Sequence, residues 1–436
     1  MSKDAKNSTS DVRLRLPQRN QVVWKAQCID ELLPPDHQAR VVWSVVCGLE
    51  LSAFHEPIKA RQGVVGRDAT DPRVLVALWL YASLRGIGSA RELARRCQES
   101  RPFQWLCGDV TLNHRLLSDF RTDHGQALEK LFASVIATLV KKDLVKVKRI
   151  SQDGVRARAS AGSSSFRRSQ TLAKLREAAQ EHMRQLGELL EDPEKSAGLS
   201  ARERAAKRKA ARERQKRIEE AMKLIPQLQE RQERAAKRLS KKQKKEQQSE
   251  PRASTTDSEA MRMKMGDGGY RPAVNVQLAA DTDSRAIVGV DVTNQGVDYE
   301  QSEPMRQQVE QTTGQKVQEH LVDGGYVKNE VIERAHGEVT LYAPPKPPRN
   351  TDKRADAYQP MASDSPAIAQ WRSRMGSEQG KEIYKLRAST SETINAQMRR
   401  MGLTQLTVRG LQKAKCVVLW SALAYNLTLF AKELMG

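Results

Sequence analysis

A long, polar and strongly basic segment at about residues 165–260 separates one expected strand from the strands that follow it. Residues 201–250 contain 18 Lys and Arg side chains and 8 acidic ones, which leaves a net charge of +10. Apolar residues at helical spacing form a partial seam in each half, which predicts an antiparallel helical hairpin. We expect its turn at residues 192–200 and a disordered exit at residues 245–258. The hairpin could bind DNA, pair two subunits or present a solvated charged surface, and its spacing alone does not distinguish these roles.

The residues before this segment have the apolar periodicity of short helices. Residues 1–20 are polar and expected to be disordered, whereas residues 21–143 form a predicted all-α domain. Asp71, followed by proline, is typical of a helix start, and Ser89 with Glu92 makes a capping box for the next helix. Arginines recur on these helices, so we expect a DNA-binding domain. A helical domain whose arginines are only solvated is the alternative.

Strand-like alternation begins after the helical domain and returns beyond the basic segment. It predicts a first strand that runs out at Asp153, and a hairpin formed by residues 273–280 and 287–292. Further strands are expected to end at Asp323 and to span 339–342, with helices at 303–311, 382–401 and 411–434. This order predicts an α/β domain, a mixed sheet flanked by helices, assembled from residues 144–164 and 261–436.

The net charge of the chain, +21 from 74 Lys and Arg against 53 Asp and Glu, favours a polyanionic partner. Nucleic acid is the commonest such partner, and a membrane surface is the rival. The N-terminus lacks the apolar core of a signal peptide, and the most apolar stretch, residues 416–427, is too short to cross a bilayer. Five scattered cysteines without a CxxC pair, and seven histidines without zinc-ligand spacing, argue against a disulfide framework and a zinc site. We therefore expect a cytoplasmic protein that binds DNA and no membrane.

Three carboxylates, Asp153, Asp323 and Glu392, have the placement that a metal-dependent site for cutting phosphodiester bonds needs. Asp153 and Asp323 are expected at strand ends, each followed by glycine, and Glu392 on a late helix. Such cutting uses two divalent ions, and Mg²⁺ prefers carboxylate and water oxygens. Alone, an Asp-Gly pair is more often a turn, and a glutamate near a helix start is more often a dipole partner. Their combination on a chain of charge +21 makes the hypothesis more specific.

Other acidic residues have simpler explanations. Asp281 and Asp298 lie in or beside the predicted strand hairpin, where turn chemistry accounts for them. The Asp-Gly-Gly sequence that starts at Asp267 precedes its strand, so we expect a loop there. The rival helical glutamates, Glu378 and Glu382, lie nearer the start of their helix.

The sequence blocks 150–154, 321–326 and 384–392 resemble the three catalytic blocks of DDE-type bacterial insertion-sequence transposases. Blocks in the N-terminal third resemble the helical N-terminal domain of that family; they lie at residues 33–37, 51–54, 71–75, 104–106 and 117–121. The resemblance covers most of residues 24–430. It implies an RNase H-like catalytic domain that the basic hairpin interrupts after the first strand.

By this resemblance, the catalytic and metal-holding residues are Asp153, Asp323 and Glu392, with two Mg²⁺ or Mn²⁺ ions expected. The residues implied to contact DNA near the cut are Tyr384, Arg387 and Arg399. Two positions depart from the family pattern: lysine often stands where this chain has Arg399, and an aromatic residue often follows the glutamate that matches Glu392.

The implied activity is cleavage of double-stranded DNA at the terminal inverted repeats of an insertion sequence, followed by strand transfer into target DNA. Family members act on paired ends, so a homodimer or larger assembly is expected on DNA. Two alternatives stay open: a DNA-binding protein without catalysis, and an RNase H-like nuclease that cuts without joining.

Overall fold

The structure, a computed structural model, describes residues 28–60, 67–192, 197–236, 250–346 and 356–435 and a few single residues between these ranges. The predicted disorder of residues 1–20 therefore falls outside the described residues, residue 20 excepted, as does that of residues 245–249.

Short helices make up the N-terminal part, and two of them start at the capping residues that the sequence indicated. Asp71 accepts a hydrogen bond from the backbone N–H of Arg73 at 2.8 Å, and Ser89 accepts one from that of Glu92 at 3.4 Å. Each bond satisfies a backbone donor that the first helical turn leaves free. The elements are η1 (Ile29–Leu32), α1 (Gln38–Cys47), α2 (Ser52–His55), α3 (Pro72–Leu84), α4 (Ala90–Glu99), α5 (Arg101–Cys107), α6 (His114–Asp123) and α7 (Gly125–Lys141).

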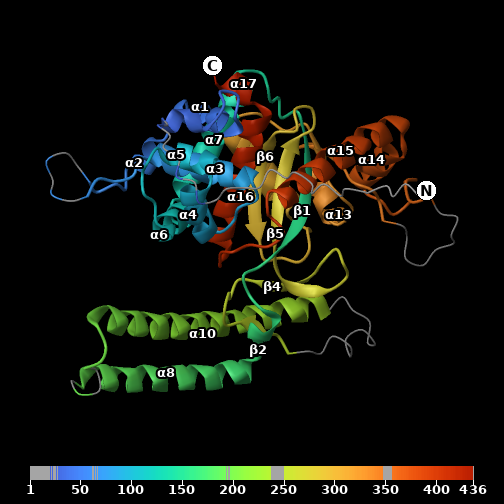
Figure 1. Cartoon of the computed structure of the whole chain (residues 1–436). Coiled ribbons are helices and arrows are strands. Elements are labelled where there is room, and N and C mark those ends of the chain that lie inside the picture. The colour runs from blue at the N-terminus through green and yellow to red at the C-terminus, as the bar shows by residue number, and fades with distance from the viewer. Residues whose placement is uncertain are drawn as a thin grey trace, which may run out of the picture.

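The central sheet has the strand order β4–β5–β1–β7–β8, and β6 pairs with β5 as well. Strands β4, β5, β6 and β1 pair antiparallel, whereas β7 runs parallel to β1 and β8 parallel to β7. The predicted strand hairpin is present as β5 and β6, and the whole arrangement is the predicted RNase H-like mixed sheet (Figure 1). The strands are β1 (Arg149–Arg158), β4 (Met261–Lys264), β5 (Tyr270–Asp281), β6 (Ile287–Thr293), β7 (Glu319–Leu321) and β8 (Thr340–Tyr342).

Helices from the C-terminal part flank this sheet. Helix α12 packs against β6 and α7, and α15 packs along β1 beside Asp153. The helices are α12 (Ser302–Thr313), α13 (Asn329–Ala335), α14 (Pro366–Gly376), α15 (Glu378–Arg400), α16 (Leu411–Leu429) and α17 (Ala431–Leu434).

Helix α16 joins the N-terminal helices and the sheet into one hydrophobic core. It lies between them in Figure 1 and contacts α3, α7 and β6. Its buried Asn426 is satisfied because its side-chain amide both donates to and accepts from the backbone of Ile287, at 2.7 and 2.9 Å. The apolar stretch at residues 416–427 is therefore part of a core helix. No helix within the described residues is long and apolar enough to cross a membrane.

The basic insertion contains the predicted antiparallel hairpin, formed by α8 (Ser169–Glu191) and α10 (Ala201–Ala236). Leu172 of α8 shares a buried cluster with Ala221, Ile225 and Leu228 of α10. In Figure 1 the two helices project from the end of the sheet near β4, and α10 lies closer to the sheet than α8 does. A short two-stranded sheet stands at their base, made of β2 (Phe166–Arg167), which follows η2 (Ser163–Ser165), and β3 (Ala253–Ser254).

Two boundary predictions are wrong. The first strand does not run out at Asp153: β1 begins at Arg149 and continues to Arg158, because the long strand β5 pairs with it from Ile150 to Arg158. The exit of the insertion is ordered over residues 250–258, where β3 forms and the buried Asp257 accepts a hydrogen bond from the backbone N–H of Gly410 at the start of α16. Both errors arose from local composition, which carries no information on distant partners.

Candidate active site

Asp153 and Asp323 lie at the same level of two neighbouring strands. Strands β1 and β7 are parallel, with Ser151 opposite Leu321, and each aspartate follows two residues later. The two carboxylates are close enough to interact, because the charge of Asp323 contributes to a raised pKa of Asp153. The structure thus brings together the two aspartates that the sequence singled out.

The Asp153 carboxylate is mostly buried and is held through both of its oxygens. Burial is the main reason that its pKa lies above the usual value, and the Arg387 guanidinium opposes that rise. Arg387 Nη2 lies 3.1 Å from Asp153 Oδ1, which also accepts the backbone N–H of Gly154 at 3.0 Å. Asn395 donates from Nδ2 to Oδ2 at 2.8 Å. A charge that desolvation disfavours is compensated here by directed donors.

Helix α15 carries the two side-chain donors, Arg387 and Asn395, and is fixed against β1. Ser377 caps its start by accepting the backbone N–H of Gly380 at 3.0 Å. Further along, the Ser391 hydroxyl is hydrogen-bonded to the Ser151 hydroxyl at 2.6 Å. Glu392 follows directly, three residues before Asn395, and its side chain is exposed. Glu392 therefore lies about one helical turn before Asn395, the residue that donates to Asp153.

The two aspartates fit a divalent cation in their chemistry, because carboxylate oxygens are the ligands that Mg²⁺ prefers. Within the ranges that the structure describes, however, no three His, Cys, Asp or Glu side chains are gathered as a metal ion would need. The exposed Glu392 is the nearest candidate along α15 for a third carboxylate.

The three residues expected to contact DNA have different surroundings. The Tyr384 hydroxyl donates to the backbone carbonyl of Val322, next to Asp323, at 3.2 Å, and burial raises its pKa to about 12. Arg387 is half-buried and paired with Asp153. Arg399 is exposed near the end of α15. Contact with DNA stays a prediction for all three.

A polar network behind Asp153 was missed by sequence reasoning. Asp298 does not serve a turn, because its Oδ1 accepts from Asn275 and Gln277 of β5, both at 2.7 Å. The Tyr326 hydroxyl donates to Gln277 Oε1 at 2.6 Å. A Cβ on Gly154 would collide with Asp298, so only glycine fits where this network meets β1.

Asn395 was also missed as a functional side chain, although its position gave a signal. It lies on the same helical face as Glu392, three residues further on, which is the spacing of neighbours on a helix surface. No comparable signal exists for the Asp298 network, because its members come from different strands and loops.

Comparisons with known protein families agree with this architecture. Residues 27–123 match the model of a transposase domain (DUF772), and residues 348–430 match that of a transposase DDE domain. The second match includes Glu392 and the residues around it but reaches neither Asp153 nor Asp323. Neither the curated proteins nor the solved structures compared with the chain gave a match.

An RNase H-like sheet whose late helices match a transposase DDE domain supports the class of DDE transposases for this chain. The transposase domain matched over the N-terminal helices supports, more narrowly, an insertion-sequence transposase. Proteins of this class act on DNA, and they generally use divalent metal ions.

Proposed function

We propose that the protein cuts DNA at the ends of an insertion sequence and joins the freed 3′ ends to target DNA. In this proposal Asp153, Asp323 and Glu392 hold two Mg²⁺ or Mn²⁺ ions. The observation that carries it is the pairing of β1 with β7, which sets the two aspartates side by side under a helix that bears the glutamate. The partners are double-stranded DNA, as terminal repeats and as target, and further copies of the chain assembled on it.

The chemistry divides between the ions and the protein. When bound, the ions would activate the attacking oxygen and stabilise the leaving one. The protein orients its carboxylates: Arg387 and Asn395 fix Asp153, and the backbone N–H of Gly325 donates to Asp323. Tyr384, with a pKa of about 12, remains a neutral hydrogen-bond donor at physiological pH.

Arg387 lies where its guanidinium can exchange one anionic partner for another. It neutralises Asp153 in the structure, and its planar fork suits a phosphate equally well. In place of Asp153, Arg387 could pair with a DNA phosphate, which would reconcile the observed ion pair with the DNA contact expected from the sequence.

Replacing any one of the three carboxylates should abolish metal-dependent cutting. Asp153→Asn, Asp323→Asn and Glu392→Gln each remove a charge that holds metal rather than phosphate, so DNA binding should stay near that of the wild type. The measurements are nicking of a labelled duplex that carries an element end, and binding to the same duplex by fluorescence anisotropy. Glu382→Gln is the matched control, since Glu382 lies on the same helix but pairs with Lys385 on its surface. A carboxylate variant that cuts at the wild-type rate would show that its residue is misassigned.

The two alternative functions give different results in the same assays. A DNA-binding protein without catalysis would bind the duplex but show no metal-dependent nicking. An RNase H-like nuclease would nick it, yet would fail to join pre-cut ends to a target plasmid. Joining of pre-cut ends by the wild type, lost in the carboxylate variants, is the outcome expected of a transposase.

A further inference from the structure

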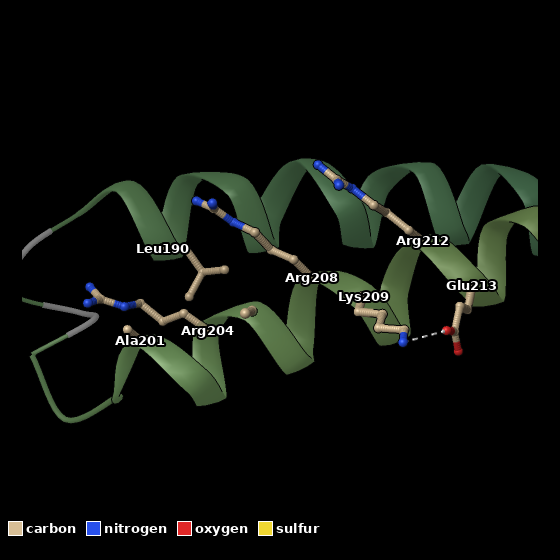
Figure 2. Close-up of a pocket in the computed structure, with 8 residues that line it drawn as sticks. Leu190, Ala201, Arg204, Arg208, Lys209, Arg212 and Glu213 are labelled. Atoms are coloured by element: carbon tan, nitrogen blue, oxygen red, sulfur yellow. Dashed lines mark ion pairs between the residues drawn. The ribbon is translucent and has the colours of Figure 1, made fainter. Parts of the chain in front are cut away.

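Three arginines follow one flank of helix α10 at intervals of four residues. Arg204, Arg208 and Arg212 all line the groove between α8 and α10 and follow one another along it (Figure 2). Four residues of an α-helix rise about 6 Å, so the three side chains spread over about 12 Å of the helix. We call these three residues the arginine row.

The arginine row has no internal anionic partner. None of its three guanidinium groups makes an ion pair or a side-chain hydrogen bond with any residue that the structure describes. Other basic residues of the hairpin are paired: Arg184 contacts Glu181 and Glu188 at 2.7 and 2.6 Å, and Lys216 contacts Glu220 at 3.8 Å. Pairing of this kind neutralises part of the charge of those residues within the hairpin, whereas the charge of the arginine row is free to meet an external anion.

The groove beneath the row favours an extended polar ligand. It is open, about 690 Å³ in volume, and lined by the small apolar residues Ala201 and Ala205 together with Leu190. Arg204 is half-buried, whereas Arg208 and Arg212 are exposed. A second copy of the hairpin would find few apolar side chains to bury here, and it would bring another basic surface against this one.

We propose that the arginine row binds the phosphate backbone of a DNA duplex, as a grip that does not depend on base sequence. It rests on the proposed function only in taking DNA as the substrate. One DNA strand carries a phosphate about every 3.4 Å along the axis, so a row of about 12 Å faces three to four phosphates. The guanidinium fork matches phosphate oxygens, and such contacts position a protein without reading sequence. The hairpin that carries the row lies apart from β1 and α15, the elements of the proposed cutting site (Figure 1).

The salt dependence of DNA binding tests this assignment. The full-length chain is titrated, in chelator, with a duplex of arbitrary sequence at 50 to 200 mM salt. The variant Arg204→Gln, Arg208→Gln, Arg212→Gln should give a slope of log affinity against log salt that is shallower by about 2.7, at 0.9 per phosphate contact. Over this fourfold range of salt it should therefore lose about 40-fold less affinity than the wild type loses. Glutamine is nearly as good a helix former as arginine, so the circular dichroism should match that of the wild type.

A matched control removes the same charge from the same hairpin. The variant Arg184→Gln, Lys216→Gln, Arg234→Gln loses three cations that are held in ion pairs, so its slope should stay close to that of the wild type. Equal slopes in all three proteins would overturn the proposal, and so would equal flattening in both variants. An unchanged slope together with altered sedimentation of the arginine-row variant would overturn it in favour of subunit pairing. Because the titration is run in chelator, it measures DNA binding independently of cutting. A wild type that binds with a steep slope but does not cut DNA when metal is added would contradict the proposed function and leave the arginine row as a DNA-binding site.

Discussion

His320 is a single buried residue that should govern part of the response of this fold to acid. It lies in the short central strand β7 with 1% of its surface exposed, and its Nε2 has no hydrogen-bond partner among the described residues. Burial lowers its pKa to about 3, and the nearby Arg306 adds to the effect. The fold therefore accepts this imidazole only in its neutral form.

The sign of the resulting pH dependence follows from linkage. At pH above about 6.5 the imidazole is neutral in both states, and its full contribution to stability is present. Between pH 6.5 and about 3 only the unfolded chain takes up the proton, so stability falls by roughly 1.4 kcal/mol per pH unit. His320→Leu should reduce this acid sensitivity, whereas the exposed His336→Leu should not. Urea unfolding at pH 7, 6, 5 and 4 measures both, and parallel losses in His320→Leu and wild type would refute the assignment.

Sequence reasoning at the residue scale succeeded where the chemistry was carried by one position and its neighbours. Asp153 and Asp323 stood out through the glycines behind them. Arg387 was noticed for a DNA contact, but its pairing with Asp153 depends on how α15 crosses β1. The network around Asp298 could not be predicted, because it exists only once β5 has paired with β1.

The central element of the site is helix α15, held against β1 through Asn395. Its helical periodicity was visible in the sequence: the predicted helix spanned residues 382–401, and the observed helix is Glu378–Arg400. The strand on which α15 packs could not be predicted from the sequence, because no local pattern specifies that partner. For the same reason β1 was predicted to stop at Asp153, although its pairing with β5 carries it on to Arg158.

Removing the Asn395 donor should loosen this contact. A hydrogen bond to a charged group contributes about 1.5–3 kcal/mol, so Asn395→Leu should lower the free energy of unfolding in chelator by about that amount. Asn395→Asp should cost more in chelator, because it sets a second carboxylate against Asp153, and Mg²⁺ should restore part of the loss. Thr393→Val is the control, since that hydroxyl bonds only to Ser389 of its own helix. Urea unfolding with and without metal decides the matter, and Asn395→Leu as stable as wild type would contradict the account.

At the scale of the whole molecule, the structure consists of one core and one projecting helical hairpin. Helix α16 fuses the N-terminal helices with the RNase H-like sheet, while the basic hairpin projects from the sheet and touches it near β4, where Met261 packs against the hairpin's apolar cluster (Figure 1). The order of the elements, the insertion and the fold class were predictable from periodicity and charge. The pairing of β1 with β7 was not, because it joins segments on opposite sides of the insertion.

The central claim is that the carboxylates gathered by this pairing hold divalent metal. Four melting curves test it most directly: wild type and Asp323→Asn, each with chelator and with Mg²⁺ or Mn²⁺. In chelator the variant should melt no lower than wild type, because it relieves repulsion with Asp153 and its amide oxygen can still accept from Gly325. Metal at a hundred times its dissociation constant should stabilise the wild type by roughly 2.7 kcal/mol, and the variant should lose most of that shift. Equal metal-induced shifts in the two proteins would mean that the ion binds elsewhere, and the proposed site would be wrong.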